Sequence, residues 1–245
     1  MEISREDRER MERAHVRAWP ALRNADIDGW LWRSSGGGSQ RANSVSTIDF
    51  RGNDFPAAIA DVEARYRALG APARFQTFDA TSPAGLANLL RERGYRQSGP
   101  TTTMFKRIAP SPAPPEVESH DGASVEWLQV YLGEITENRR AVNTLILERV
   151  PAPRAFFGYR RGTEIVATAL CVTGFGCAVI ECVTTRADVR RTGAARAVLA
   201  ALEAWAAGQD ADWIGLQVVT GNLSAVALYE SMGFVAGATN TFWVR

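Results

Sequence analysis

The sequence is poor in the residues that most often form nucleophilic or metal sites, with only two histidines and three cysteines. His15 and His120 lie in segments expected at the periphery, so neither a histidine base nor a Cys–His nucleophile is predicted. The cysteines are Cys171, Cys177 and Cys182, an odd number without the spacing of metal ligands. Because all three stand in apolar, strand-like sequence, we expect buried thiols and no metal site.

The chain also lacks an excess of charge and a long apolar run. Its formal net charge is +1, which gives no general attraction to nucleic acid or to a membrane surface. The uncharged run between Glu164 and Glu181, like the one between Asp212 and Glu230, is shorter than the roughly 20 residues that a membrane helix needs. Residues 1–8 are highly charged and contain no apolar signal-peptide core. We therefore predict a cytoplasmic protein with no nucleic-acid or membrane partner.

Proline is concentrated in one segment, Ala109–Pro115, which reads Ala-Pro-Ser-Pro-Ala-Pro-Pro. Such a segment is semi-extended and cannot continue a helix or a central strand. We therefore predict an N-terminal domain over residues 1–109, a linker over 110–119 and a second domain over 120–245.

Basic and small residues gather between Val189 and Arg196, directly before an apolar helix pattern. Gly193 and the two alanines that follow it keep the first helical turn free of bulk, so backbone N–H groups can approach a ligand closely. A helix start with free N–H groups and flanking arginines suits a phosphate or a pyrophosphate. The segment therefore predicts an anion site.

Two segments together carry a family resemblance. Arg190–Ala195 reads R-x-x-G-x-A, and Asn222–Phe234 reads N-x-x-A-x-x-L-Y-x-x-x-G-F after an expected strand at Leu216–Val219. In order and spacing they resemble the segments with which the GNAT superfamily of N-acetyltransferases binds acetyl-CoA. The resemblance covers the C-terminal half and implies an α/β (α+β) fold, in which mixed, mostly antiparallel sheets are flanked by helices.

The resemblance also implies which residues bind acetyl-CoA. The N–H groups of residues 191–196 would hold the pyrophosphate, and the pantetheine arm would pair with the strand before that loop. Val183 N–H is implied as the donor to the thioester carbonyl oxygen, and Asn222 as a contact of the pantetheine arm or, alternatively, a helix cap. The implied acetyl-CoA-binding residues are Val183, Thr184, Thr185, Arg190, Arg191, Thr192, Gly193, Ala194, Ala195, Arg196, Asn222 and Tyr229.

The proton-transfer groups are less fully specified. Tyr229 is implied as the general acid, since a phenol with a pKa near ~10 can protonate a leaving thiolate with a pKa near ~8.5; the alternative is a core tyrosine that packs on Phe234. Glu181 stands in the apolar run Ala178–Val183, so it either deprotonates the amine through water or is a paired structural carboxylate. Gln217 stands where some protein-acetylating relatives carry a glutamate, and an amide cannot act as a base.

The N-terminal half repeats part of this pattern. Gly94–Tyr95 aligns with Gly233–Phe234 at the end of a short helix. Arg51–Pro56 stands at the place of the phosphate loop without its motif, and Leu90 or Arg91 replaces the tyrosine. We therefore predict a tandem GNAT-like fold whose first copy is degenerate and serves as a support or as a wall of the substrate site.

These observations favour an acetyl-CoA-dependent N-acetyltransferase that acts on a primary amine of a small molecule or an amino acid. One alternative is a peptide or protein N-terminal acetyltransferase, which near-neutral charge and Gln217 make the weaker hypothesis. A second alternative, from another class, is a non-catalytic CoA-binding sensor. The sequence predicts a monomer or a homodimer.

Overall fold

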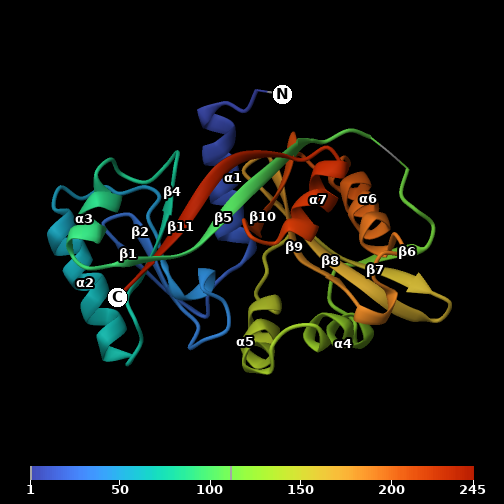
Figure 1. The fold of residues 1–245 in the computed structure, drawn as a ribbon, viewed down its shortest axis with the longest axis horizontal. Helices are drawn as coiled ribbons and strands as arrows, with labels where there is room; N and C mark the ends of the chain where they lie inside the picture. Colours follow the sequence, from blue (N-terminus) through green and yellow to red (C-terminus); the bar gives the residue numbers. More distant parts are fainter. Residues whose placement is uncertain (1, 111) are drawn as a thin grey trace.

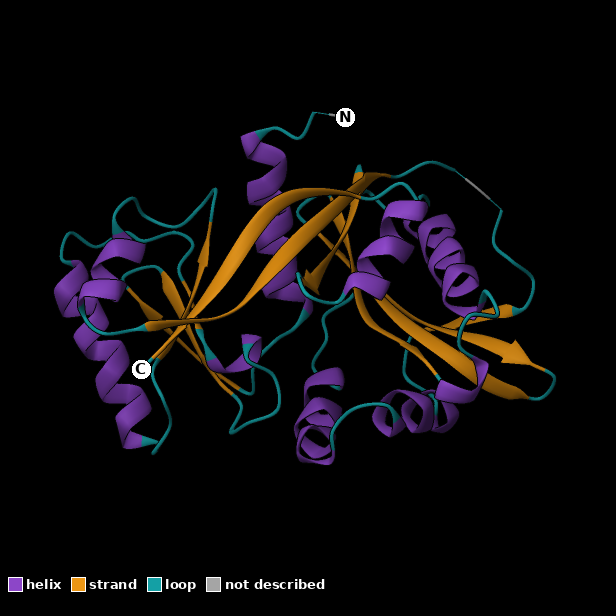
Figure 2. Cartoon of the chain, viewed as in Figure 1, coloured by secondary structure: helices purple, strands orange, loops and turns teal. Residues whose placement is uncertain are grey.

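The computed structural model describes residues 2–110 and 112–245, and these form one continuous 11-stranded sheet. Helices cover both faces of the sheet, and two long strands run through its middle (Figures 1 and 2). The strand order is β1-β2-β3-β4-β11-β5-β10-β9-β8-β7-β6. The sheet is mixed and mostly antiparallel, as predicted, since only the β3–β4 and β9–β10 pairs are parallel.

The helices and strands have the following bounds. The helices are α1 (Arg5–Ala18), α2 (Phe55–Ala68), α3 (Leu86–Glu92), α4 (Val125–Gly133), α5 (Glu137–Leu147), α6 (Ala194–Ala206) and α7 (Leu223–Ser231), with 3-10 turns η1 (Arg41–Asn43) and η2 (Ala187–Val189). The strands are β1 (Arg23–Ile27), β2 (Trp30–Ser34), β3 (Val45–Ser46), β4 (Arg74–Phe78), β5 (Arg96–Arg107), β6 (Val117–His120), β7 (Arg154–Arg161), β8 (Glu164–Gly174), β9 (Cys177–Thr185), β10 (Trp213–Val219) and β11 (Val235–Val244).

Two units of the chain have the same connectivity. Each consists of two parallel strands joined by a helix, then a shorter helix and an antiparallel strand: β3-α2-β4-α3-β5 and β9-α6-β10-α7-β11. The two last strands are exchanged between the units. Strand β5 lies between β10 and β11, and β11 lies between β4 and β5.

The exchange joins the two halves through backbone hydrogen bonds. In Figure 1, β5 (green) and β11 (red) run side by side across the middle of the molecule. Their antiparallel register extends from Val235↔Phe105 to Val244↔Arg96. The C-terminal strand therefore completes the sheet of the N-terminal half, and separating the halves would expose the edges of four strands.

Helix α1 also crosses between the halves. Ser4 and Asp7 form a capping box that starts it, and Met11, Ala14 and Ala18 form its buried face. That face packs against β8, β9 and β10 of the C-terminal half. The first helix of the chain therefore covers one face of the second half's sheet.

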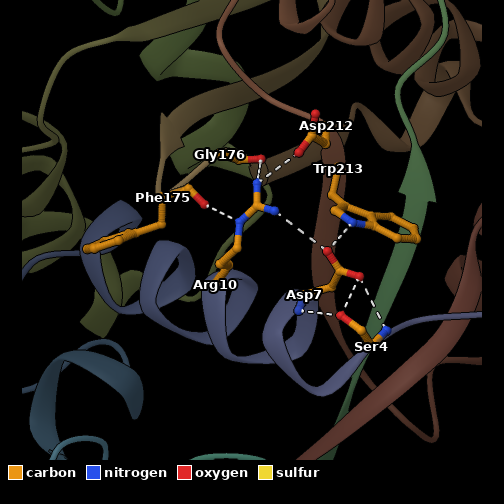
Figure 3. A network of polar contacts seen from close by, with 7 residues as sticks. All are labelled: Ser4, Asp7, Arg10, Phe175, Gly176, Asp212 and Trp213. Carbon is orange, nitrogen blue, oxygen red and sulfur yellow. Dashed lines mark hydrogen bonds and ion pairs between the residues drawn. The ribbon is translucent and has the colours of Figure 1, made fainter.

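Polar contacts fix α1 in this place (Figure 3). Arg10 donates hydrogen bonds to the carbonyl oxygens of Phe175 (2.9 Å) and Gly176 (2.9 Å) and pairs with Asp212 at 3.1 Å. The indole N–H of Trp213 donates to Asp7 at 2.7 Å. Because these bonds reach the β8–β9 turn and the start of β10, they hold the helix against the strands that form the cleft described below.

Apolar side chains form three buried clusters. One lies between α1, α4 and the sheet of the C-terminal half, a second lies under α6 on the opposite face, and a third lies under α2 in the N-terminal half. Cys171 and Cys177 are fully buried and Cys182 is partly buried, all with free thiols. No helix among residues 2–110 and 112–245 is both long and apolar enough to cross a membrane.

Candidate active site

A cleft of about 1400 Å³ opens where two parallel strands separate. Strands β9 and β10 pair only at Trp213↔Cys177, Ile214↔Ala178 and Gly215↔Val179. Beyond these pairs the strands diverge, and the residues from Ile180 and from Leu216 onward line the two walls. The sheet thus leaves unpaired backbone inside a cavity, where an extended ligand can pair with it.

A β-bulge lies on one wall of the cleft. Ala169 on β8 is opposed by two residues of β9, Cys182 and Val183, and Cys182 has a φ of 54°. A bulge leaves its extra residue outside the ladder and turns the strand locally. This geometry favours the predicted role of Val183 N–H as a donor to a carbonyl oxygen, which stays a prediction.

The predicted phosphate loop forms the next part of the wall. Gly193 is the N-cap of α6 with a φ of 92° and no side-chain cap. No atom lies within 4 Å of a Cβ built on Gly193, so it is the left-handed backbone, not crowding, that requires glycine here. The first N–H groups of α6 therefore point out of the helix without a capping partner, as an anion site requires.

The three arginines of the loop have different surroundings. Arg190 pairs with Glu134 at 2.6 Å and donates to the carbonyl oxygen of Thr185, whereas Arg196 donates to Ser231 at 2.6 Å. Arg191 has no hydrogen bond or ion pair within the described part of the chain and has a φ of 63°.

Thr192 is the one predicted cofactor residue outside the cleft lining. Its hydroxyl donates to the carbonyl oxygen of Val189 at 2.8 Å and so closes the loop on itself. The other predicted residues line the cleft together: Glu181, Val183, Thr184, Thr185, Arg190, Arg191, Gly193, Ala194, Ala195, Arg196, Asn222 and Tyr229.

Helix α7 brings Tyr229 and Asn222 to the opposite wall. The side chain of Asn222 accepts a hydrogen bond from Ala225 N–H, so it caps the helix while it lines the cleft. The Tyr229 ring is 7% exposed and packs edge-on against Phe234, with 6.0 Å between ring centroids. Burial and then the charge of Glu181 raise the pKa of Tyr229 to about 12, so its hydroxyl keeps its proton at neutral pH.

Glu181 is held by a residue of the N-terminal half. Arg41 of η1 donates to both of its carboxylate oxygens, at 2.5 and 2.6 Å, and His15 Nδ1 lies 3.9 Å from one of them. Burial raises the pKa of Glu181, but the charge and hydrogen bonds of Arg41 outweigh it and lower the pKa to about 2. Such a carboxylate is a poor proton acceptor, so the geometry favours the paired-carboxylate interpretation that the sequence left open.

The cleft also contains residues that were not individually predicted as site residues. Trp19, Ser39 and Arg41 come from the N-terminal half, and Tyr131 and Arg139 come from α4 and α5. Their places depend on contacts between distant segments. In the described part of the chain, no three His, Cys, Asp or Glu side chains are grouped so that they could hold a metal ion.

Gln217 lies on β10 in the same cleft. Its amide oxygen and nitrogen are both buried, and neither has a hydrogen-bond partner within the described residues. Unpaired buried amide atoms are costly, so a ligand or bound water is expected to satisfy them.

Comparison with known proteins identifies the family. A sequence model of the family described as "Probable histone acetyltransferase Rv0428c C-terminal" matches residues 6–241. The "Uncharacterized N-acetyltransferase YobR" of Bacillus subtilis (strain 168) is 28% identical, with 94% of this chain and 95% of that protein covered.

Solved structures agree on the fold. A GCN5-related N-acetyltransferase from Kribbella flavida superposes with a TM-score of 0.72 at 18% identity, over 97% of this chain and 95% of that one. A tandem GNAT protein from the clavulanic acid biosynthesis pathway superposes with a TM-score of 0.64 at 12% identity, over 82% and 74% of the two chains. The chain thus belongs to the Rv0428c C-terminal acetyltransferase family and is a GNAT N-acetyltransferase.

Proposed function

We propose that this enzyme transfers the acetyl group of acetyl-CoA to a primary amine of a small molecule or an amino acid. The observation that carries the proposal is that the uncapped start of α6 and the protonated Tyr229 line one cleft. The first can bind a pyrophosphate, and the second can donate a proton. Acetyl transfer requires both: the pyrophosphate is bound at one end of the pantetheine arm, and the thiolate is protonated at the other end.

Each step of the transfer falls to a named group. The amine nitrogen attacks the thioester carbon while Val183 N–H, at the bulge, stabilises the developing negative charge on the carbonyl oxygen. The C–N bond forms, the C–S bond breaks, and Tyr229 gives its proton to the leaving thiolate. The attacking nitrogen becomes cationic in the tetrahedral intermediate and loses a proton to water, and Tyr229 regains a proton from water after the thiol has formed. Glu181 holds Arg41 in place, and we assign it no proton transfer, since both of its oxygens are paired.

We further propose that the chain arose by duplication and binds one acetyl-CoA. The shared connectivity of β3-α2-β4-α3-β5 and β9-α6-β10-α7-β11 supports the duplication. The start of α2 offers fewer free N–H groups than that of α6, because Asp54 accepts from Ala57 N–H and Pro56 has no N–H. In this proposal the N-terminal half supplies a wall of the cleft through Trp19, Ser39 and Arg41, which precede the first unit in the chain. The cytoplasmic location and the monomeric or homodimeric state stay predictions from the sequence.

Release of free CoA thiol from acetyl-CoA, in the presence of a panel of amines, tests the activity. We expect amine-dependent thiol release and a product that is heavier by one acetyl group. Equilibrium binding is expected to give one acetyl-CoA per chain. Tight binding of acetyl-CoA without thiol release for any amine would contradict the proposal and favour a CoA-binding sensor instead.

A further inference from the structure

Charge is unevenly distributed within the cleft. Two glutamates and five arginines line it. Both glutamates are already paired, Glu181 with Arg41 and Glu134 with Arg190. The cleft therefore has an excess of positive charge before any ligand enters, and bound anions are expected to balance it.

The positive charge of Arg139 is the part of this excess that the phosphates of acetyl-CoA are not expected to balance. Arg191 and Arg196 lie at the α6 start, where the phosphates of acetyl-CoA would balance them. Arg139 belongs instead to the first turn of α5. Its guanidinium has no hydrogen bond or ion pair to any described residue, and its Nε is buried without a partner.

Arg139 lies in the same cleft as the bulge. It lines the cleft together with Cys182 and Val183 of the bulge and with Tyr131 of α4. Its charge opposes the upward pKa shifts that burial, the largest cause, gives the Cys182 thiol and the Tyr131 phenol. A ligand bound by Arg139 would therefore lie in the cleft that contains Val183, the proposed donor to the thioester carbonyl oxygen.

No hydrogen bond or ion pair in the described residues gives the Arg139 guanidinium a structural role. A cation in the first turn of a helix is opposed by the helix dipole. A guanidinium with a buried, unpaired N–H also pays a desolvation cost. An anion that binds at Arg139 in the cleft would offset both costs; the amide of Gln217, which lines the same cleft, is also unpaired.

On this basis, and resting on the proposed acetyl transfer, we propose that the acceptor is an amino-acid-type amine whose carboxylate is bound by Arg139. The planar guanidinium can hold a carboxylate through two parallel hydrogen bonds. The carboxylate fixes the acceptor so that its amine faces the thioester carbon. A lysine-rich protein tail would meet the same excess of positive charge and be repelled.

The test compares the common amino acids with their primary amides, in which a neutral group of nearly the same shape replaces the carboxylate, at a pH where the α-amines of both are deprotonated. We expect kcat/KM for the best amino acid to exceed that for its amide by about 10- to 100-fold, the range for a charge-assisted hydrogen bond. Arg139→Gln is expected to remove this preference and leave the KM for acetyl-CoA unchanged. Arg139→Lys, which keeps the charge without the fork, should restore part of it.

Arg140→Gln is the matched control, because Arg140 is an exposed neighbour on the same helix and does not line the cleft. It should leave the preference for the amino acid intact. Three results would overturn the proposal: equal rates with acid and amide, faster reaction of lysine-rich histone-tail peptides, or a rise in the KM for acetyl-CoA in Arg139→Gln, which would place Arg139 on the cofactor.

A binding measurement separates this proposal from acetyl transfer itself. If no amine supports thiol release, the acetyl-transfer proposal fails, whereas the carboxylate site is still tested by calorimetric titration of amino acids and amides into the protein–CoA complex. Binding of amino acids that is lost in Arg139→Gln would support the site without turnover. Equal binding of acid and amide would contradict it.

Discussion

Helix α6 begins at Gly193 with no side-chain cap, whereas α2 begins behind Asp54, whose carboxylate accepts a hydrogen bond from Ala57 N–H at 2.9 Å. Both helices join two parallel strands, so the same topology has two different helix starts. At α2, Pro56 supplies no N–H, and a carboxylate occupies the place that an anion would need. The comparison indicates that the residues of one helical turn, and not the topology, decide whether a helix start is open to an anion.

The ends of the two shorter helices differ in a parallel way. Tyr95 N–H bonds to the carbonyl oxygen of Leu90, and Phe234 N–H bonds to that of Tyr229, each directly after a glycine with positive φ. These matched bonds align Leu90, one of the two residues proposed from the sequence, with Tyr229. Leu90 is fully buried, whereas Tyr229 lines the cleft. The first unit thus has an apolar side chain where the second has a proton donor.

The largest expected effect comes from removing the phenol of Tyr229, since the first unit has Leu90 at the matching position. Tyr229→Phe keeps the ring that packs on Phe234 but removes the proton for the thiolate, so turnover should fall by about 10²- to 10⁴-fold. The dissociation constant of acetyl-CoA should change little. Steady-state thiol release and calorimetry measure the two quantities. Tyr95→Phe, the same change in the first unit, is the control, and equal turnover in the two variants would remove Tyr229 from the mechanism.

The next largest effect tests how the N-terminal half supports the second unit. Arg41→Met leaves the buried Glu181 without its partner, which should lower the free energy of unfolding by about 3–5 kcal/mol. Adding Glu181→Gln to Arg41→Met should recover most of this loss, because no unpaired charge is then buried. Urea unfolding of the single and double variants measures both, and a single variant as stable as the parent would show that the pair contributes little.

The pH dependence of that variant has a defined sign. In the parent, the folded-state pKa of Glu181, about 2, lies below its ordinary value of 4.5. The pair therefore stabilises the fold above pH 4.5, and this contribution is lost as the pH falls from 4.5 toward 2. The stability gap between parent and Arg41→Met should consequently be widest near neutral pH and close in acid. A gap that stays constant with pH would indicate lost packing instead of a lost charge pair.

A smaller effect is expected when the α6 start is given a carboxylate like that of α2. Gly193→Asp places a negative charge at the proposed pyrophosphate site, and acetyl-CoA affinity should fall by about 100-fold. Gly193→Asn is the matched variant, since asparagine has the same shape, tolerates positive φ and carries no charge. Its affinity should fall much less. Calorimetric titration measures both, and equal losses would assign the effect to backbone strain alone.

The sequence was most informative where contacts are local. The α6 start and the α7 segment are contiguous motifs, so the shape of Gly193 and the place of Tyr229 follow from a few neighbouring residues. The Glu181–Arg41 pair joins residues 140 apart in the chain. No periodicity reports such a contact, and for this reason the carboxylate could equally be interpreted as a base.

The exchange of β5 and β11 could not be predicted from sequence patterns, for a related reason. Neither strand has a regular apolar alternation that would specify its neighbour, and only the packing of the whole sheet decides the partner. Helix α1 shows the same limit, because its buried face does not reveal which sheet it covers. Arg139 was not predicted as a site residue either, since its lack of a partner is visible only once every neighbour is placed.

The smallest expected effect concerns the helix start that has no proposed ligand. Asp54→Ala removes the cap of α2 and should lower the free energy of unfolding by about 1 kcal/mol. It should not create a second acetyl-CoA site, because Pro56 still lacks an N–H and Leu90 remains in place of the tyrosine. Asp210→Ala, at an exposed residue outside any helix or strand, controls for loss of one negative charge. Unfolding in urea measures the stability. A titration that reached two acetyl-CoA per chain in Asp54→Ala would contradict this prediction, because it would show that the Asp54 carboxylate alone prevents the first unit from binding acetyl-CoA.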